Sequence, residues 1–397
     1  MNIKKHIITL GTFAIFAILV TLTACDETVD TTRTNSGYSR PETTTEPLPT
    51  YATTGYETEL LSNTRLLVQN SRRSGEGYFS ADGTQFIYQS EEPDSGNPFY
   101  QIFLMDLSSG ETRRVSPGTG LTTCSWIHPS LDRIMFSSTH EDPDTLNKQA
   151  QEIALRESGQ RRRYGWDYDP NYEIWQANSH GGELTNLTNS EGYDAEGSYS
   201  ADGTQILFAS NREAYTRPLS QAEQKLFNAD NSYFMDLYIM DATGNNVKQL
   251  TFSPGYDGGP FFSPDNNKIV WRRFNPDGNS AEIWTMNTDG SNQRQLTANN
   301  MVNWGPYYHP SGAYIIYSSN LLGHANFELF LIDTNGQHDP VRVTNTEGTD
   351  ILPVFSPNGS QLAWSTTRTP DGTSQIHIAN WNHNKAMQLL DITNAEQ

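Results

Sequence analysis

The chain repeats one pattern six times: a Ser-Pro-Asp-Gly-like turn, a short apolar strand, a second strand that ends in an acidic residue, and Leu-Thr. The first half reads GYFSADGTQFIYQS from Gly77 and PVFSPNGSQLAWST from Pro353, and all six copies of this half align without a gap. The copies recur about every 47 residues, apart from two insertions. A repeat of this kind restricts the chain to an architecture of stacked, near-identical units.

Each repeat contains four short alternating or aromatic-rich runs separated by turn residues, which predicts four antiparallel strands. Asp82-Gly83, Asp202-Gly203 and Asn358-Gly359 supply the positive-φ positions that tight hairpins need. One four-stranded sheet cannot bury both of its faces, whereas six sheets in a ring pack face to face. We therefore predict an all-β protein, a six-bladed β-propeller of four-stranded antiparallel blades, over residues 60–390.

The repeated pattern FSPDG…IYxMDxxG…QLT resembles the propeller repeat of the TolB family, a relative of the WD repeat, over roughly residues 60 to 390. The resemblance implies the fold. For function it leaves several classes, because this propeller serves as a partner-binding platform, as the substrate-filtering half of prolyl-oligopeptidase-like enzymes, and as a polysaccharide lyase. Residues 64–68 and 386–390 both fit the strand that would close the ring, and the sequence leaves the two open.

Residues 1–24 read as a secretory signal, with Lys4 and Lys5 before an apolar core at 7–20. This core is about 14 residues long, shorter than the roughly 20 that a membrane-spanning helix needs. The run Leu-Thr-Ala-Cys that ends at Cys25 resembles the bacterial lipobox, which implies lipidation of Cys25 and anchoring on the periplasmic side. Asp26 implies, by enterobacteria-like sorting, the inner membrane rather than the outer one.

Residues 25–59 are rich in Thr, Pro, Glu and Ser, which predicts a flexible tether, and residues 391–397 form a short tail. With Cys25 lipidated, Cys124 is the remaining thiol, and no internal disulfide is expected. The chain has 46 acidic and 26 basic residues and a net charge of −20. This charge argues against nucleic acid and against electrostatic docking on anionic lipid, and it fits a basic partner, a cation or simple solubility.

Two insertions, residues 140–171 and 211–235, connect the second and third strands of blades 2 and 3, so we expect them side by side on one face of the ring. In the first insertion four residues follow helical spacing: Leu146, Ala150, Ile153 and Ala154. In the second, Ser220 and Glu223 form a capping-box signature. We predict two short helical insertions on this face and inert, regular hairpins on the other.

A basic and aromatic cluster follows the first of these helical patterns: Arg161, Arg162, Arg163, Tyr164, Trp166 and Tyr168. Arg, Tyr and Trp are enriched at the centres of protein interfaces. The cluster is interpreted either as a solvated patch that pairs with nearby acids or as the contact surface for an envelope protein partner.

Acidic residues recur at equivalent positions where the chain enters the inner strand of a blade: Asp194, Asp257 and Asp350 in one register, and Glu76 and Glu196 in another. Because inner strands line the channel of a propeller, we expect these carboxylates to converge near its mouth. Three roles stay open: capping of the backbone turns, binding of a metal such as Ca²⁺, and contact with a ligand or partner that enters the channel.

The sequence contains no G-x-S-x-G or H-E-x-x-H motif, and its histidines lack ligand spacing. His128 and His309 replace the Ser of the repeat, where a structural hydrogen bond to the turn is expected. We interpret the chain as a non-catalytic binding protein without a cofactor. The alternatives are a metal-dependent enzyme, a substrate filter for a separate peptidase, and a lyase-like polysaccharide enzyme that uses residues near the elaborated face: Arg212, Arg272, Arg273 and His324.

Overall fold

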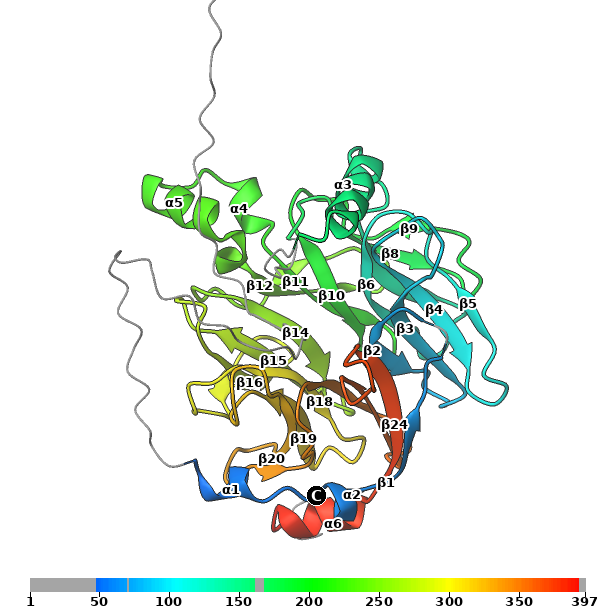
Figure 1. The fold of residues 1–397 in the computed structure, drawn as a ribbon. Helices are drawn as coiled ribbons and strands as arrows, with labels where there is room; N and C mark the ends of the chain where they lie inside the picture. Colours follow the sequence, from blue (N-terminus) through cyan, green and yellow to red (C-terminus); the bar gives the residue numbers. More distant parts are fainter. Residues whose placement is uncertain (1–47, 70, 161–167, 393–397) are drawn as a thin grey trace, which may run out of the picture.

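The computed structural model describes residues 48–69, 71–160 and 168–392, which form six four-stranded antiparallel sheets in a ring (Figure 1). From the inner strand outward, blades 1 to 3 consist of β2 (Ser74–Phe79), β3 (Gln85–Glu91), β4 (Tyr100–Asp106) and β5 (Thr112–Arg114); β6 (Thr122–Ile127), β7 (Ile134–Ser138), β8 (Glu173–Ala177) and β9 (Thr185–Asn186); and β10 (Asp194–Tyr199), β11 (Gln205–Ser210), β12 (Asp236–Asp241) and β13 (Lys248–Gln249). Blades 4 to 6 consist of β14 (Asp257–Phe262), β15 (Lys268–Phe274), β16 (Ala281–Asn287) and β17 (Arg294–Gln295); β18 (Asn303–Tyr308), β19 (Tyr314–Ser319), β20 (Glu328–Asp333) and β21 (Val341–Arg342); and β22 (Asp350–Phe355), β23 (Gln361–Thr366), β24 (Gln375–Trp381) and β1 (Leu61–Leu66). The predicted six-bladed propeller is confirmed.

The core lies between neighbouring blades and is built from the second and third strands of each blade. Each second strand carries an aromatic residue at the same repeat position, at most 3% exposed: Tyr88, Phe136, Phe208, Trp271, Tyr317 and Trp364. Burying a side chain of this size stabilises the fold by about 1.5–3 kcal/mol relative to leaving it in water. One sequence position, repeated in every blade, therefore supplies much of the packing between blades.

The hairpin turns also join one blade to the next. In blade 2 the Nδ1 atom of His128 accepts the main-chain N–H groups of Ser130 and Leu131. Its Nε2 then carries the proton and donates to the carbonyl of Gly203 in blade 3, at 3.1 Å. His309 of blade 5 has its Nε2 3.4 Å from the carbonyl of Gly359 in blade 6. The predicted structural role of both histidines is confirmed, and it extends across the blade boundary.

The ring is closed by the N-terminal strand, because β1 pairs with β24 as the outermost strand of blade 6. The competing C-terminal run lies in helix α6 (His383–Leu389) and adds no strand. Two short helices, α1 (Thr50–Thr53) and α2 (Glu57–Leu60), fall within the segment predicted as a flexible tether, so that expectation is wrong for its last part. Ala52 and Leu60 are each at most 1% exposed and pack against apolar residues of the last blades. The composition of the segment did not indicate this burial.

The first insertion contains the predicted helix, α3 (Thr145–Glu157), but its apolar residues do not dock it. Leu146 is 68% exposed, while polar side chains attach the helix to blades 1 and 2. Gln149 accepts the N–H of Gly120 at 2.8 Å, and Arg156 pairs with Glu91 at 3.1 Å. The predicted helix is confirmed, and the contacts that attach it are polar.

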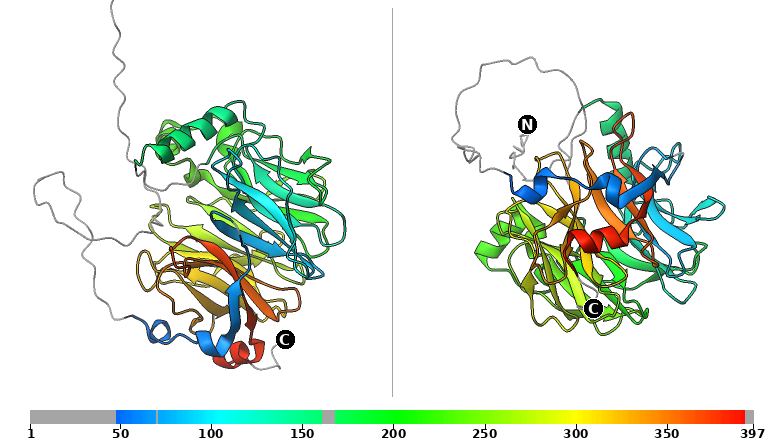
Figure 2. Two further views of the ribbon diagram at one scale, coloured as in Figure 1. Left: turned by 45° about the vertical axis from the view of Figure 1, so that its right-hand side comes forward. Right: turned by 90° about the horizontal axis from the view of Figure 1, so that it is seen from below.

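The second insertion contains α4 (Glu213–Thr216), α5 (Gln221–Ala229) and the 3-10 helix η1 (Asn231–Phe234). The predicted capping box of Ser220 and Glu223 is present at the start of α5. The two insertions meet where the side chain of Asn231 donates to the carbonyl of Tyr168, at 3.2 Å. They gather α3, α4 and α5 at one end of the molecule, with α1, α2 and α6 at the other (Figures 1 and 2). Throughout the described ranges, each helix is too short or too polar to cross a bilayer.

Candidate functional site at the channel

Every inner strand has a β-bulge at its third residue, where the pairing with the second strand shifts register. The six bulge residues all have φ between 29° and 60°: Glu76, Cys124, Glu196, Gly259, Gly305 and Leu352. Non-glycine residues rarely adopt positive φ, and bulges often redirect a side chain next to a functional site. The ring of bulges therefore forms one layer of the channel, with two carboxylates and one thiol in it.

Glu196 is the centre of a buried ion-pair cluster in this layer. Its Oε1 atom lies 2.8 Å from Nη2 of Arg272 and accepts the hydroxyl of Tyr256 at 2.5 Å. Its Oε2 atom accepts the N–H of Gly259 at 2.5 Å. The Arg272 side chain is 3% exposed and stacks between two rings, 3.9 Å from the centroid of Trp304 and 4.8 Å from that of Tyr256. Burial lowers the pKa of Arg272, but the neighbouring Glu196 carboxylate and the tyrosines around it together raise this pKa by more. The guanidinium therefore stays charged.

Glu76, the second carboxylate, forms no ion pair with the lysines and arginines of the described residues. It accepts the hydroxyl of Tyr78 at 2.8 Å, and the thiol of Cys124 lies 3.6 Å from its Oε2 atom. Burial, with a smaller contribution from the charge of Glu196, raises the pKa of Glu76 to about 7. Burial and both carboxylates raise the pKa of Cys124 well above its ordinary value, so this sulfur stays a neutral thiol and is not an activated nucleophile.

Aromatic rings fill the channel on both sides of this layer. At the fifth position of the inner strands, four rings pack with centroids 4.4–6.4 Å apart: Tyr78, Trp126, Phe261 and Tyr307. Toward the insertions, Tyr168 packs edge-on against Tyr193 at 5.3 Å and against Tyr256 at 5.7 Å. The carboxylate layer is therefore enclosed by aromatic side chains, one of which comes from the first insertion.

The three aspartates predicted at the channel mouth lie elsewhere. Each is at most 1% exposed and is bonded to an arginine of its own blade. The separations are 2.5 Å for Asp194–Arg212, 2.7 Å for Asp257–Arg273 and 3.0 Å for Asp350–Arg368. Their donors are side chains, not the N–H groups of the turns. The expectation that these aspartates converge at the mouth is wrong, whereas Glu76 and Glu196 do come together.

These aspartates serve the blade interfaces, where each lies beside an acid that begins the third strand of the preceding blade. The pairs are Glu173 with Asp194, Asp236 with Asp257, and Glu328 with Asp350. Burial raises the pKa of Glu173, Asp236 and Glu328 to about 7 and that of Asp194 to about 6. Each pair of neighbouring acids is therefore held by an arginine on the aspartate and by partial protonation near neutral pH, and in the third pair Arg342 also bonds to Glu328 at 2.8 Å.

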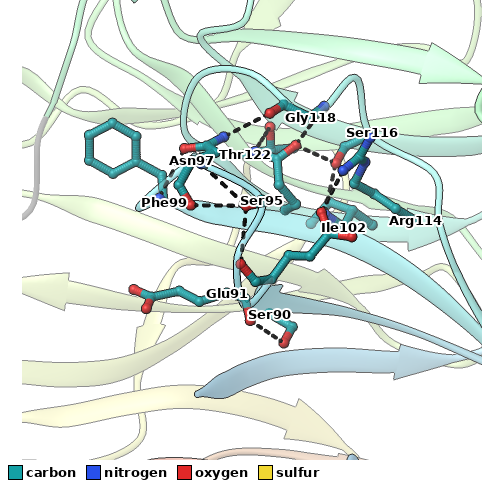
Figure 3. A network of polar contacts seen from close by, with 12 residues as sticks. Ser90, Glu91, Ser95, Asn97, Phe99, Ile102, Arg114, Ser116, Gly118 and Thr122 are labelled. Atoms are coloured by element: carbon teal, nitrogen blue, oxygen red, sulfur yellow. Dashed lines mark hydrogen bonds and ion pairs between the residues drawn. The ribbon is translucent and has the colours of Figure 1, made fainter. Parts of the chain in front are cut away.

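At the other three interfaces a neutral residue occupies the position of the aspartate: Asn303 in blade 5, Thr122 in blade 2 and Ser74 in blade 1. Between blades 4 and 5, Asn303 donates from Nδ2 to Glu282 at 2.9 Å, and no arginine is needed. Between blades 1 and 2, Nε2 of Gln101 lies 3.5 Å from the hydroxyl of Thr122, and between blades 6 and 1, Gln375 accepts from Ser74 Oγ at 2.8 Å. The other end of the Gln101 amide accepts from Ser116 Oγ at 2.7 Å and from the N–H of Gly118 at 2.9 Å. Asn97 donates to the carbonyl of Gly118 in the same network, at 3.1 Å (Figure 3). An aspartate at this position therefore occurs with an arginine, and a neutral residue occurs without one.

The predicted partner residues are only partly described. Arg161, Arg162, Arg163, Tyr164 and Trp166 lie outside the described residues, as does the predicted lipidation site Cys25. Tyr168, predicted as part of that surface, lies over the channel, where burial raises its pKa. Among residues 48–69, 71–160 and 168–392, no three His, Cys, Asp or Glu side chains are grouped closely enough to hold a metal ion.

Arg272 is a central residue of this layer that the sequence places only in the lyase alternative and not among the predicted channel-mouth residues, although a signal was present. At the end of the second strand the other blades have Gln-Ser, Ser-Ser, Ala-Ser or Ser-Thr, and only blade 4 has the doublet Arg272-Arg273. Arg273 balances Asp257 at the blade interface, while Arg272 points into the channel layer and balances Glu196. Comparing the six copies position by position would have separated these two roles.

No protein-family model matches the chain. Among solved structures it is similar to a putative TolB from Agrobacterium tumefaciens, with a TM-score of 0.53 and 18% identity, covering 80% of this chain and 94% of that one. It is also similar to TolB from Acinetobacter baumannii, with a TM-score of 0.52 and 17% identity over 76% of this chain and 64% of that one. A gluconolactonase from Xanthomonas campestris matches with a TM-score of 0.52 and 12% identity over 80% and 89% of the two chains. At these identities the likeness shows the fold alone, a TolB-like propeller that other proteins use for different purposes.

Proposed function

We propose that the protein is a lipid-anchored envelope protein that binds a protein partner through the end of the propeller bearing α3, α4 and α5. The observation that carries the proposal is the apolar surface that these additions expose. Leu146 on α3 is 68% exposed and Leu226 on α5 is 41% exposed. Phe252, in the link from blade 3 to blade 4 on the same face, is 75% exposed. Exposed apolar side chains mark an interaction site where they form a contiguous patch, so the proposal holds that these three residues contact the partner together.

The point at which the described chain enters the propeller supports the proposed lipid anchor and partner surface. The described chain begins at α1, at the end of the molecule opposite α3, α4 and α5 (Figures 1 and 2). A tether from a lipidated Cys25 would therefore join the propeller at the end opposite the insertions. Replacing Cys25 with Ser should abolish incorporation of a radiolabelled fatty acid, and replacing Asp26 with Ser should move the protein to the outer-membrane fraction. Unchanged labelling of the Cys25→Ser variant would rule out this anchor.

The partner surface is tested with matched substitutions. Leu146→Glu and Phe252→Glu should each weaken capture of a cross-linked partner at least tenfold, because a charge would have to be desolvated in the interface. Leu131→Glu is the control, since Leu131 is 61% exposed on a hairpin turn of the opposite face. Equal losses for Leu146→Glu and Leu131→Glu would contradict the proposal.

A second candidate, an acid–base enzyme acting on a polysaccharide, is favoured by one observation. The channel layer holds two carboxylates with different surroundings, Glu196 bonded to Arg272 and Glu76 with a pKa near 7. Groups with a pKa near the working pH are effective general acids and bases. Product formation from uronate polymers that is lost in Glu76→Gln would establish this alternative, and its absence over a broad substrate panel would leave the binding function.

A further inference from the structure

Helix α6 fastens the segment that closes the ring. Its N-cap residue Asn382 donates its N–H to the carbonyl of Leu60 at 2.9 Å and its amide to the carbonyl of Glu59 at 3.1 Å. Lys385 pairs with Glu59 at 2.6 Å. Figure 2 shows α6 beside α2 at this end of the molecule. Since α2 leads directly into the closing strand β1, the docking of α6 supports the closure.

Two stacked imidazoles join α6 to blade 5. The ring of His383, the first residue of α6, lies parallel to that of His309, with centroids 4.4 Å apart and planes inclined by 4°. His309 is 4% exposed and occupies the position where four other repeats have Ser. The stack therefore connects His309, which differs from the repeat, to the helix that packs on the closing segment.

The hydrogen bonds around the stack fit two neutral rings. Nδ1 of His309 accepts the N–H of Ser311 at 3.1 Å. Nδ1 of His383 lies 3.0 Å from the hydroxyl of Tyr314, whose oxygen already accepts the indole N–H of Trp381 at 2.8 Å. When Nδ1 of His383 is unprotonated, Tyr314 donates its proton to that atom. Protonation of Nδ1 of His309 would set it against the N–H of Ser311, and protonation of Nδ1 of His383 would remove the acceptor of the Tyr314 proton.

The surroundings oppose a positive charge on either ring. His383 lies in the first turn of α6, where the helix dipole is positive. The charged groups of the packed helices, Lys385 on α6 and Glu59 on α2, neutralise each other, and Tyr314 is neutral in this range. Burial, reinforced by His383, lowers the pKa of His309 to about 4, and burial also lowers that of His383.

We propose that the His309–His383 stack is an acid-sensitive latch that holds α6 on the ring closure at neutral pH and releases it as the pH falls. Release exposes the rings to water, where each ordinarily binds a proton near pH 6.5. The folded pKa of His309 lies below this unfolded value, so its stabilising contribution is complete above about pH 6.5 and is lost as the pH falls towards 4. The buried acids between blades, whose pKa values are raised, respond to pH in the opposite direction.

Hydrogen exchange of the purified full chain, corrected for the intrinsic rate at each pH, tests the latch. The protection of the α6 amides should fall by up to about tenfold per pH unit for each ring below pH 6.5, while the amides of β10 stay protected. His383→Gln, which keeps an acceptor for Tyr314 and does not titrate, should flatten this dependence, and His309→Ser should also flatten it.

His128→Ser is the matched control, because His128 occupies the same repeat position and packs against Tyr199 at 4.9 Å, with no second histidine. This variant should keep the pH dependence of α6. The proposal is overturned if His383→Gln retains the wild-type slope, or if α6 and β10 lose protection together, which would report unfolding of the whole ring.

Discussion

Replacing Arg212 with Met would test the charge balance at the interface of blades 2 and 3. Asp194 is completely buried, its bond to Arg212 is 2.5 Å, and Glu173 lies beside it. Removing one partner of a buried ion pair costs about 3–5 kcal/mol, because the other charge stays buried without compensation. With an unfolding entropy of about 2.1 cal/mol/K per residue, a propeller of roughly 340 residues should lose about 4–7 °C in Tm.

The pH dependence and a second variant make this prediction specific. Asp194 already has a pKa of about 6 with Arg212 present, so loss of the arginine should raise it further, and the deficit relative to wild type should be smaller at pH 5 than at pH 8. Asp194→Asn/Arg212→Met imitates the interface of Asn303 with Glu282 and should recover most of the lost stability. Scanning calorimetry at both pH values measures these differences. A loss below about 1 kcal/mol for Arg212→Met, or no recovery in the double variant, would refute the charge-balance argument.

Three further predictions concern the turns, the interfaces and the channel. Gly203→Ala should lower the stability to thermal unfolding more than Gly312→Ala does. Both glycines have φ near +73°, so either alanine adds backbone strain of about 1–2 kcal/mol, but only at Gly203 would the new Cβ lie 2.5 Å from the ring of His128. Equal losses in the two variants would argue against the contact with His128. Asp236 has a folded pKa of about 7, above its unfolded value, so its stabilising protonation is complete below about pH 4 and lost as the pH rises through 7; Asp236→Asn should remove about 2–3 kcal/mol of the stability difference between pH 5 and pH 8, as measured by denaturant unfolding. At pH 8, Glu76→Gln should leave Tm unchanged or higher, because an unpaired buried charge is removed, whereas Glu196→Gln should lower it by leaving Arg272 without its anion; a loss in both variants would show that Glu76 is held by compensating contacts.

The repeat alone was sufficient to predict the architecture of this protein. Six copies with tight-turn residues and four strand-like runs each can bury their faces only by stacking in a ring, so blade number and strand order follow from local pattern. The capping box at Ser220 and the structural role of His128 were also readable, because both depend on residues close in sequence or on one repeat position.

Only the tertiary structure decided which strand closes the ring and where the acids point. Residues 61–66 and 375–381 are far apart in sequence, and they pair only because the first and last parts of the ring come together in space. Asp194 and Glu196 are two residues apart on one inner strand, yet the bulge at Glu196 directs the first side chain into the blade interface and the second into the channel. The local pattern is enough to place a residue on an inner strand. The partner that neutralises its charge comes from elsewhere in the chain, as Arg272 does for Glu196 and Arg212 does for Asp194. That partner distinguishes a channel residue from an interface residue.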